Sequence, residues 1–141
     1  MSGIPVRLFG GANPINSSKI GQLIVAPFAY DDVVAKTLET DNTAVNFYKP
    51  QVNMRFVITG ILLTADSNVT GSALIDVYEA TTASETTIAK AILHVEILKN
   101  GSRDITNLNI LATEGTWINA KTDDDDVFVT IMGYYVPAVA E

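Results

Sequence analysis

Four consecutive aspartates, at positions 123 to 126, form the densest group of potential metal ligands in the sequence. Ca²⁺ takes about six to eight oxygen ligands, so several carboxylates on one loop could bind it. The run of Asp123, Asp124, Asp125 and Asp126 lacks the alternate-residue spacing and the glycine of a helix–loop–helix calcium loop. Successive side chains of an extended segment would also point to opposite faces. The pattern favours a solvated, like-charged turn that keeps a strand edge from aggregating, with a calcium site as the alternative.

His94 is the only histidine, and the chain has no cysteine. A zinc or iron site of the cupin type needs several histidines with a carboxylate, which this sequence does not supply. A Ser–His–acid triad needs a serine in a glycine-rich elbow, and no serine here has that pattern around it. We therefore predict no catalytic residue, no metal and no cofactor, and we expect His94 to be a strand residue that is partly buried or faces another subunit.

Asp76 and Glu96 lie in predicted strands and are the first pair to test for glycoside hydrolysis, which uses two carboxylates. The chain has 16 acidic residues, and nothing in the sequence favours these two over the others. A small β-fold hydrolase is therefore the last-ranked hypothesis.

The elements that position these residues are predicted to be strands. Eight or more short apolar segments, most of them alternating with polar residues, are separated by turn residues. They are residues 23–30, 33–38, 43–48, 55–64, 73–79, 88–98, 105–111, 116–120 and 127–136. Residues 88–98 also fit a helical stripe, but the neighbouring strands favour a strand there. We expect an all-β fold, a jelly roll or β-sandwich of about eight to ten antiparallel strands.

Residues 55–64 form the strongest predicted strand, because apolar side chains lie on both of its faces. The expected faces are Phe56, Ile58 and Leu62 on one side and Val57, Ile61 and Leu63 on the other. A strand that is apolar on both sides is typical of the centre of a covered sheet. We expect a second sheet over one face and a neighbouring subunit or loop over the other.

Three aromatic residues near the end of the chain are candidates for a subunit interface: Trp117, Tyr134 and Tyr135. Tyr134 and Tyr135 are adjacent in a predicted strand and must point to opposite faces, so at least one is expected at a surface or an interface. Gly133, just before them, indicates a bulge or a close backbone approach. An exposed patch of Trp117, Tyr134 or Tyr48 would instead suit stacking against a sugar.

Residues 1–21 are interrupted by glycine, proline, asparagine and serine too often for a regular element. We expect an extended N-terminal arm there, followed by one domain over residues 22–141. Residues 1–30 contain two basic residues and no acid, whereas the rest of the chain carries all 16 acids. Such an arm could dock on an acidic protein surface. The arm residues expected to bind a partner are Val6, Arg7, Leu8, Phe9 and Lys19.

Two classes of partner are not expected. The acidic domain has no stripe of Lys and Arg to displace phosphate counterions, so we expect no nucleic acid. No apolar segment reaches the ~20 residues that a membrane helix requires, so we expect no membrane partner.

Residues 115–136 contain, in succession, a tryptophan strand, an acidic turn and a terminal strand with a Gly-Tyr-Tyr sequence. This segment resembles the closing hairpin of jelly-roll proteins that trimerise, including the tumour-necrosis-factor-like group. With residues 47–50 (FYKP), residues 56–60 (FVITG) and the Gly/Asn/Ser-rich arm, the chain resembles small virion proteins of tailed bacteriophages. Among these, head decoration (cement) proteins are the nearest. The resemblance covers roughly residues 43–136.

The resemblance implies a non-enzymatic homotrimer that is assembled in the host cytoplasm and becomes part of the virion. Its arm would engage the major capsid protein and stabilise the phage head, and no catalytic residue carries over from the group. The alternative is a carbohydrate- or receptor-binding module of a phage tail or tail fibre.

Overall fold

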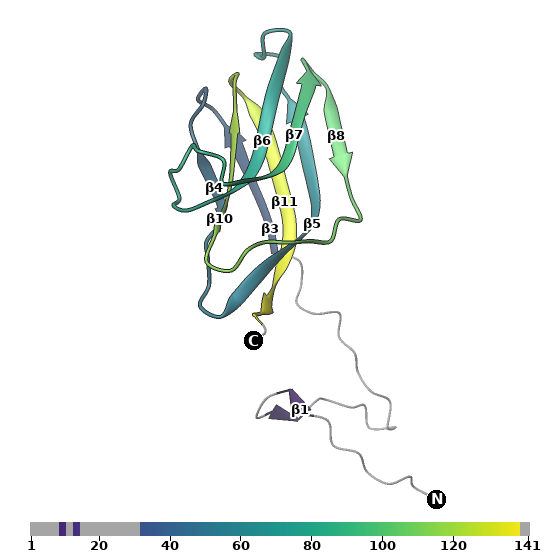
Figure 1. Ribbon diagram of the computed structural model, residues 1–141. Coiled ribbons are helices and arrows are strands. Elements are labelled where there is room, and N and C mark those ends of the chain that lie inside the picture. The colour runs from purple at the N-terminus through teal and green to yellow at the C-terminus, as the bar shows by residue number, and fades with distance from the viewer. Residues whose placement is uncertain (1–8, 11–12, 15–31, 139–141) are drawn as a thin grey trace, which may run out of the picture.

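The computed structural model describes residues 9–10, 13–14 and 32–138 of the chain. Every regular element in these residues is a β-strand (Figure 1). The strands are β1 (Phe9–Gly10), β2 (Asn13–Pro14), β3 (Asp32–Leu38), β4 (Val45–Tyr48), β5 (Met54–Ala65), β6 (Ser72–Ala80), β7 (Lys90–Leu98), β8 (Ser102–Ile105), β9 (Ile110–Leu111), β10 (Trp117–Thr122) and β11 (Val127–Pro137). The all-β prediction is therefore confirmed.

Strands β3 to β11 form two antiparallel sheets that pack face to face as a β-sandwich (Figure 1). One sheet has four strands in the order β4-β10-β6-β7. The other has five strands, with β3-β11-β5-β8 in order and β9 paired with a second part of β5. Apolar side chains from both sheets fill the space between them as one core.

The segment for which the sequence also allowed a helix, residues 88–98, contains strand β7. Val95 and Ile97 pair with core-facing residues of β6 and pack inward. His94 and Glu96 point to the opposite face. The period of two in this segment was therefore the correct signal.

The predicted strand over residues 105–111 is wrong in its middle. Strand β8 ends at Ile105, and β9 begins only at Ile110. Between them, Asn107 has a φ of 58°, a left-handed conformation that a strand does not contain. The sheet therefore receives two short strands along one edge of β5 in place of one long strand.

Part of the predicted architecture lies outside the described residues. The expected strand at 23–30 falls there, as do the arm residues Val6, Arg7, Leu8 and Lys19. Phe9 begins β1, which forms a two-residue antiparallel ladder with β2.

The predicted faces of β5 are wrong in its second half, because the strand contains a β-bulge. The register with β11 shifts between Met132 and Gly133, which leaves Thr59 as an extra residue in β5. One extra residue reverses the alternation of all the side chains that follow. Leu62 therefore faces outward. The core-facing side chains of β5 are Phe56, Ile58, Ile61, Leu63 and Ala65.

Gly133 makes the close approach that the sequence predicted. A Cβ at this position would lie 2.1 Å from the carbonyl oxygen of Val57 and 2.6 Å from the ring of Phe56. Because the oxygen belongs to the backbone, it cannot move aside as a flexible side chain could. Only glycine fits here, and its place opposite the bulge fixes which side chains of β11 face the core. Those fully buried are Val127, Val129 and Ile131.

Candidate functional site

The aspartate run forms the turn between β10 and β11 and is held by hydrogen bonds. Asp123, Asp124 and Asp126 accept them from the connection between β5 and β6 and from the start of β6. The bonds run from Leu74 N to Asp123 Oδ1 (2.7 Å), from Thr70 N to Asp124 Oδ2 (2.8 Å) and from Asn68 Nδ2 to Asp126 Oδ2 (2.6 Å). Among the described residues, no group of three or more His, Cys, Asp or Glu side chains is placed to hold a metal ion.

These bonds give the run a role that the prediction of a solvated turn did not include. The β10–β11 turn and the β5–β6 connection both pass from one sheet to the other. The three carboxylates therefore tie the two sheets together at one end of the sandwich. We call Asp123, Asp124 and Asp126 the aspartate clamp.

Asp76 and Glu96, the carboxylates considered for hydrolysis, each have a partner on the outer face of the four-stranded sheet. Asp76 on β6 pairs with His94 on β7, with 2.5 Å between Oδ1 and Nδ1. Glu96 accepts a hydrogen bond from the hydroxyl of Ser72. The His94 side chain is 62% exposed, so His94 is a surface residue of the chain and is not partly buried. Both carboxylates thus belong to separate cross-strand contacts.

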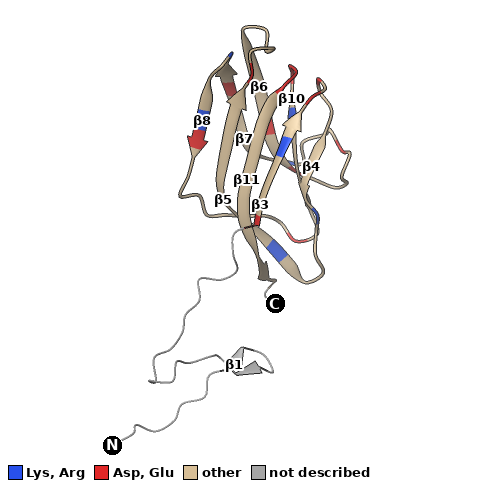
Figure 2. Cartoon of the chain, turned by 180° about the vertical axis from the view of Figure 1, so that it is seen from behind, with Lys and Arg blue, Asp and Glu red and all other residues tan. Residues whose placement is uncertain are grey.

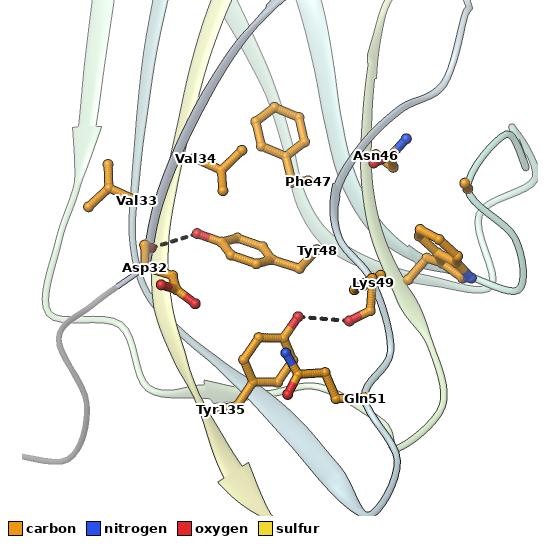
Figure 3. A pocket seen from close by; sticks show the side chains of 11 residues that line it. Asp32, Val33, Val34, Asn46, Phe47, Tyr48, Lys49, Gln51 and Tyr135 are labelled. Atoms are coloured by element: carbon orange, nitrogen blue, oxygen red, sulfur yellow. Dashed lines mark hydrogen bonds between the residues drawn. The ribbon is translucent and has the colours of Figure 1, made fainter.

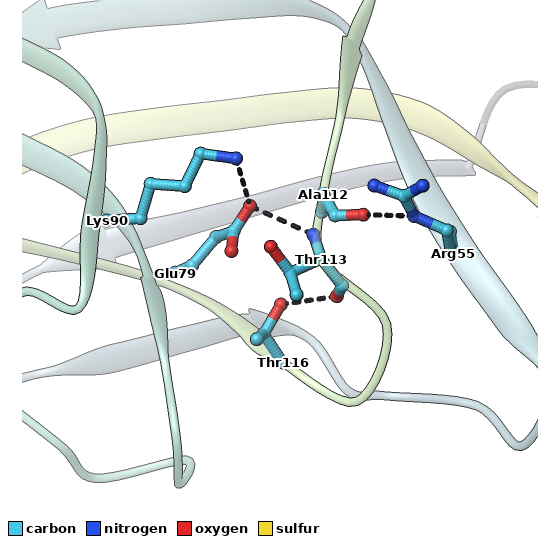
Figure 4. Close-up of polar contacts among 6 residues, drawn as sticks. All are labelled: Arg55, Glu79, Lys90, Ala112, Thr113 and Thr116. Carbon is cyan, nitrogen blue, oxygen red and sulfur yellow. Dashed lines mark hydrogen bonds and ion pairs between the residues drawn. The ribbon is translucent and has the colours of Figure 1, made fainter.

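Glu79 is a buried carboxylate that was not among the predicted site residues. Only 3% of its side chain is exposed. It accepts a hydrogen bond from the backbone N–H of Thr113 (3.0 Å) and pairs with the ammonium of Lys90 (3.4 Å; Figure 4). From the other sheet, the Arg55 side chain donates to the carbonyl of Ala112 (2.8 Å). Glu79 from the four-stranded sheet and Arg55 from the five-stranded sheet thus both hold the segment before β10. The alternation of β6, which places every second residue in the core, was the signal that could have found Glu79.

The connection between β6 and β7, residues 81–89, covers part of the outer face of the four-stranded sheet. Tyr78 points outward from β6 and yet is fully buried. Three side chains of this face donate to carbonyls of the connection: Tyr78 to Glu85 (2.7 Å), Asn119 to Thr82 (3.0 Å) and Lys121 to Thr86 (2.9 Å). Burial raises the pKa of Tyr78 above its ordinary value. This sheet therefore obtains a cover from its own chain.

An open depression of about 540 Å³ lies among residues of β3, β4, β10 and β11 (Figure 3). Tyr48 stacks on Phe56 below it, with 3.8 Å between ring centroids, and Tyr135 meets Phe56 edge-on at 5.0 Å. The Tyr135 hydroxyl donates to the carbonyl of Lys49 (2.7 Å), and that of Tyr48 lies within hydrogen-bond distance of the carbonyls of Asp32 and Ile131. Burial raises the pKa of Tyr135. The aromatic residues form a packed floor.

The outer face of the five-stranded sheet has a different composition. Its outward-facing side chains on β3, β11 and the half of β5 after the bulge carry no charge; we call them the uncharged face. They are Val33, Ala35, Thr37, Leu62, Thr64, Phe128, Thr130, Met132, Tyr134 and Val136. Exposure is 60% for Val33, 44% for Phe128 and 37% for Leu62. Figure 2 shows this side of the molecule, with β11 tan along its length.

The structure does not bring the three predicted interface residues together. Trp117 pairs with Ala80 at the outer face of the four-stranded sheet and lines the depression. Tyr134 belongs to the uncharged face, and Tyr135 packs inward against Phe56. The two tyrosines do lie on opposite faces, as their adjacent positions required.

Two features of the described residues thus remain as candidates for function: the uncharged face and the depression. Within residues 9–10, 13–14 and 32–138, no helix has the length and apolarity needed to cross a membrane. Comparisons of the chain with protein-family models, with curated proteins and with solved structures found no match.

Proposed function

We propose that this protein is a non-enzymatic structural protein of a virion: a decoration protein that forms a homotrimer and stabilises a phage head. Residues 1–21, the predicted arm, would bind the major capsid protein. The observation that carries this proposal is the uncharged face. It lies on a chain with a net charge of −7, and its Val33 and Phe128 are exposed apolar side chains in the single chain. Several exposed apolar side chains on one sheet face are typical of association sites.

We further infer that the sandwich is a jelly roll, an architecture found in viral capsid proteins. The support is the strand order. If the eight principal strands are counted along the chain, leaving out β1, β2 and the two-residue β9, one sheet reads first-eighth-third-sixth. The other reads second-seventh-fourth-fifth. This interleaving of early and late strands is the pattern that two successive Greek keys produce when they share two sheets.

The positions of the acidic side chains also support a structural role. Glu79 holds the segment before β10, and the aspartate clamp joins two inter-sheet connections. Asp76 is paired with His94 on the surface. These carboxylates act on the fold itself, in contacts spread over different parts of the sandwich.

The arm is tested by deleting residues 2–19. We expect the truncated protein to keep its β-sheet circular dichroism and its thermal midpoint, because strands β3 to β11 pair with one another. We expect it to lose binding to capsid shells assembled from the major capsid protein of the same genome. A full-length variant with Arg7→Gln and Lys19→Gln is the matched control for charge. Unchanged binding by the truncated protein would contradict the proposal.

A second candidate function is a carbohydrate- or receptor-binding module of a phage tail. The depression favours it, because Trp117, Asn46 and Gln51 line it and could stack on and hydrogen-bond a sugar. A glycan array would be probed with the wild type and with Trp117→Ala. Hits that disappear in the variant would favour this function. An array without hits, together with Trp117 fluorescence that no glycan changes, would exclude it.

A further inference from the structure

We propose that the uncharged face is the surface through which copies of this chain associate, and that its occupant is a second copy of this chain. This inference rests on the proposed function, which requires self-association without naming a surface. It also replaces the predicted set of Trp117, Tyr134 and Tyr135, of which only Tyr134 lies on this face.

The first argument is the position of the exposed apolar side chains. Seven large hydrophobic residues are exposed among the described residues. Four of them, Val33, Leu62, Leu111 and Phe128, lie at outward-facing positions of the five-stranded sheet. Single exposed apolar residues need no explanation, but several on one sheet face indicate a contact surface.

The second argument is charge. The chain carries 16 acidic and nine basic residues, so two copies repel each other through most of their surfaces. Across β3, β11 and the half of β5 after the bulge, no outward-facing side chain is charged. Charged residues occur only at the border of this face, where Asp104 of β8 is opposite Leu62 and Arg55 lies near the start of β5. A second copy can therefore contact this face without bringing acids together.

The third argument is size. Strand β11 has 11 residues, which at ~3.3 Å per residue gives a length of about 36 Å. The three strands of the uncharged face, about 4.8 Å apart, make it about 14 Å wide. A face of these dimensions is of the same order as the ~800 Å² that each partner contributes to a stable interface.

The fourth argument is that the uncharged face lacks the side chains that other kinds of occupant require. A nucleic acid or an acidic membrane surface needs basic side chains, and the uncharged face has none. A hydrophobic sheet face with threonines between its apolar residues matches a surface of the same composition. A homotypic contact satisfies this requirement without any further component.

The test compares two lysine substitutions on opposite sheets. Phe128→Lys places a charge at the end of the uncharged face next to the β10–β11 turn, between the threonines Thr37 and Thr64 of the neighbouring strands. Leu98→Lys places the same charge on β7, at a side chain that is 71% exposed. We expect light scattering to give a multiple of 15.1 kDa for the wild type and for Leu98→Lys, and 15.1 kDa for Phe128→Lys.

A second variant guards against misfolding of the first. Val33→Lys changes a residue that is 60% exposed on the edge strand β3, where the fold of the single chain does not need its side chain. We expect it to dissociate the assembly with unchanged circular dichroism. A wild type of 15.1 kDa, or lysine variants of Phe128 and Val33 that keep the wild-type mass, would overturn the inference.

The same variants separate this inference from the proposed function. If Phe128→Lys and Val33→Lys remain trimers that bind capsid shells, the inference is wrong and the decoration role stands. If both become monomers, while the wild-type oligomer binds no capsid shell, the surface is correctly assigned and the decoration role is wrong.

Discussion

The two outer faces of the sandwich differ in how far their apolar side chains are covered by the chain itself. Tyr78 and Phe128 are both aromatic, and both point outward from interior strands, β6 and β11. Tyr78 is fully buried because residues 81–89 cover it, whereas Phe128 is 44% exposed. The four-stranded sheet also carries the charged side chains of Asp76 and Lys121 on its outer face, and the five-stranded sheet has none on the uncharged face.

The difference shows how burial can be divided between one chain and its assembly. A sheet with one face in the core still has a second face, and each apolar side chain on it adds a driving force for cover. One sheet receives a loop of its own chain with specific hydrogen bonds. The other has a surface that a second copy can cover, as we propose, with no charged side chain to pair.

The largest effect is expected from a substitution that disturbs the register of β11, because the composition of the uncharged face depends on that register. We expect Gly133→Ala to lower the free energy of unfolding by about 4 kcal/mol or more, because the new Cβ would overlap the carbonyl oxygen of Val57. Urea denaturation measures this loss. The matched control is Gly115→Ala, where a Cβ meets open space and only the positive φ of 80° costs about 1–2 kcal/mol. Equal effects of the two substitutions would contradict the close approach.

Truncating one aromatic residue on each outer face measures how much its burial contributes to the free energy of unfolding. We expect Tyr78→Ala to cost about 3–4 kcal/mol in the free energy of unfolding, since the side chain is fully buried beneath residues 81–89. Phe128→Ala should cost about 1 kcal/mol or less in a single chain, because that side chain is partly exposed. Both are measured in a Val33→Lys background, which is expected to be monomeric. Similar losses would mean that the two faces are covered alike.

The aspartate clamp tests how firmly the two sheets are joined. We expect Asp123→Ala to cost about 1 kcal/mol, because the N–H of Leu74 loses its acceptor at 2.7 Å. Asp125→Ala is the control, since Asp125 is exposed and outside the clamp. Thermal denaturation with and without millimolar calcium accompanies both. A calcium-dependent rise in the thermal midpoint that Asp123→Ala removes would show that the run is a metal site.

The smallest expected effect is on pH dependence, and it concerns the covered face. Burial raises the pKa of Tyr78, so the native state holds this proton more tightly than the unfolded state does. The resulting stability is present below the ordinary tyrosine pKa of about 10 and is lost as the pH rises above it. Tyr78→Phe should flatten this alkaline decline, with Tyr135→Phe as the comparison because burial also raises the pKa of Tyr135. A decline that is unchanged in both variants would contradict these assignments.

The segment that covers the four-stranded sheet, residues 81–89, is expected to become less stable at acid pH. The backbone N–H of Thr87 donates to the Glu85 carboxylate at 2.8 Å and lowers the pKa of that group. The contribution is present above the ordinary value of 4.5 and is lost as the pH falls through the lowered pKa of the native state. We expect the hydrogen-exchange protection factors of residues 81–89, which correct for the pH dependence of the intrinsic rate, to fall at acid pH in the wild type and to be low at all pH values in Glu85→Gln.

The sequence predicted the elements better than their faces. Period-two alternation correctly identified β7 as a strand, and the same period holds in β11, where Val127, Val129 and Ile131 are buried. The same rule failed in β5, because the extra residue Thr59 is recognisable only from the pairing with β11.

The site was less predictable for a related reason. Side-chain types show that Trp117, Tyr134 and Tyr135 are aromatic, but only the pairing of β10 and β11 shows that they face three different environments. Glu79 was missed because a carboxylate is rarely expected inside a core, although it follows the inward alternation of Ile75 and Val77. The uncharged face emerges only when three strands distant in sequence lie side by side.

The place of β11 in the strand order also determines when this surface can exist during synthesis. β11 is the last strand described, and it separates β3 from β5 while pairing with both. Until residues 127–137 have left the ribosome, β3 and β5 have no shared neighbour and Phe128 is not yet available. If copies associate through this face, as we propose, nascent chains cannot join through it before residues 127–137 have been synthesised.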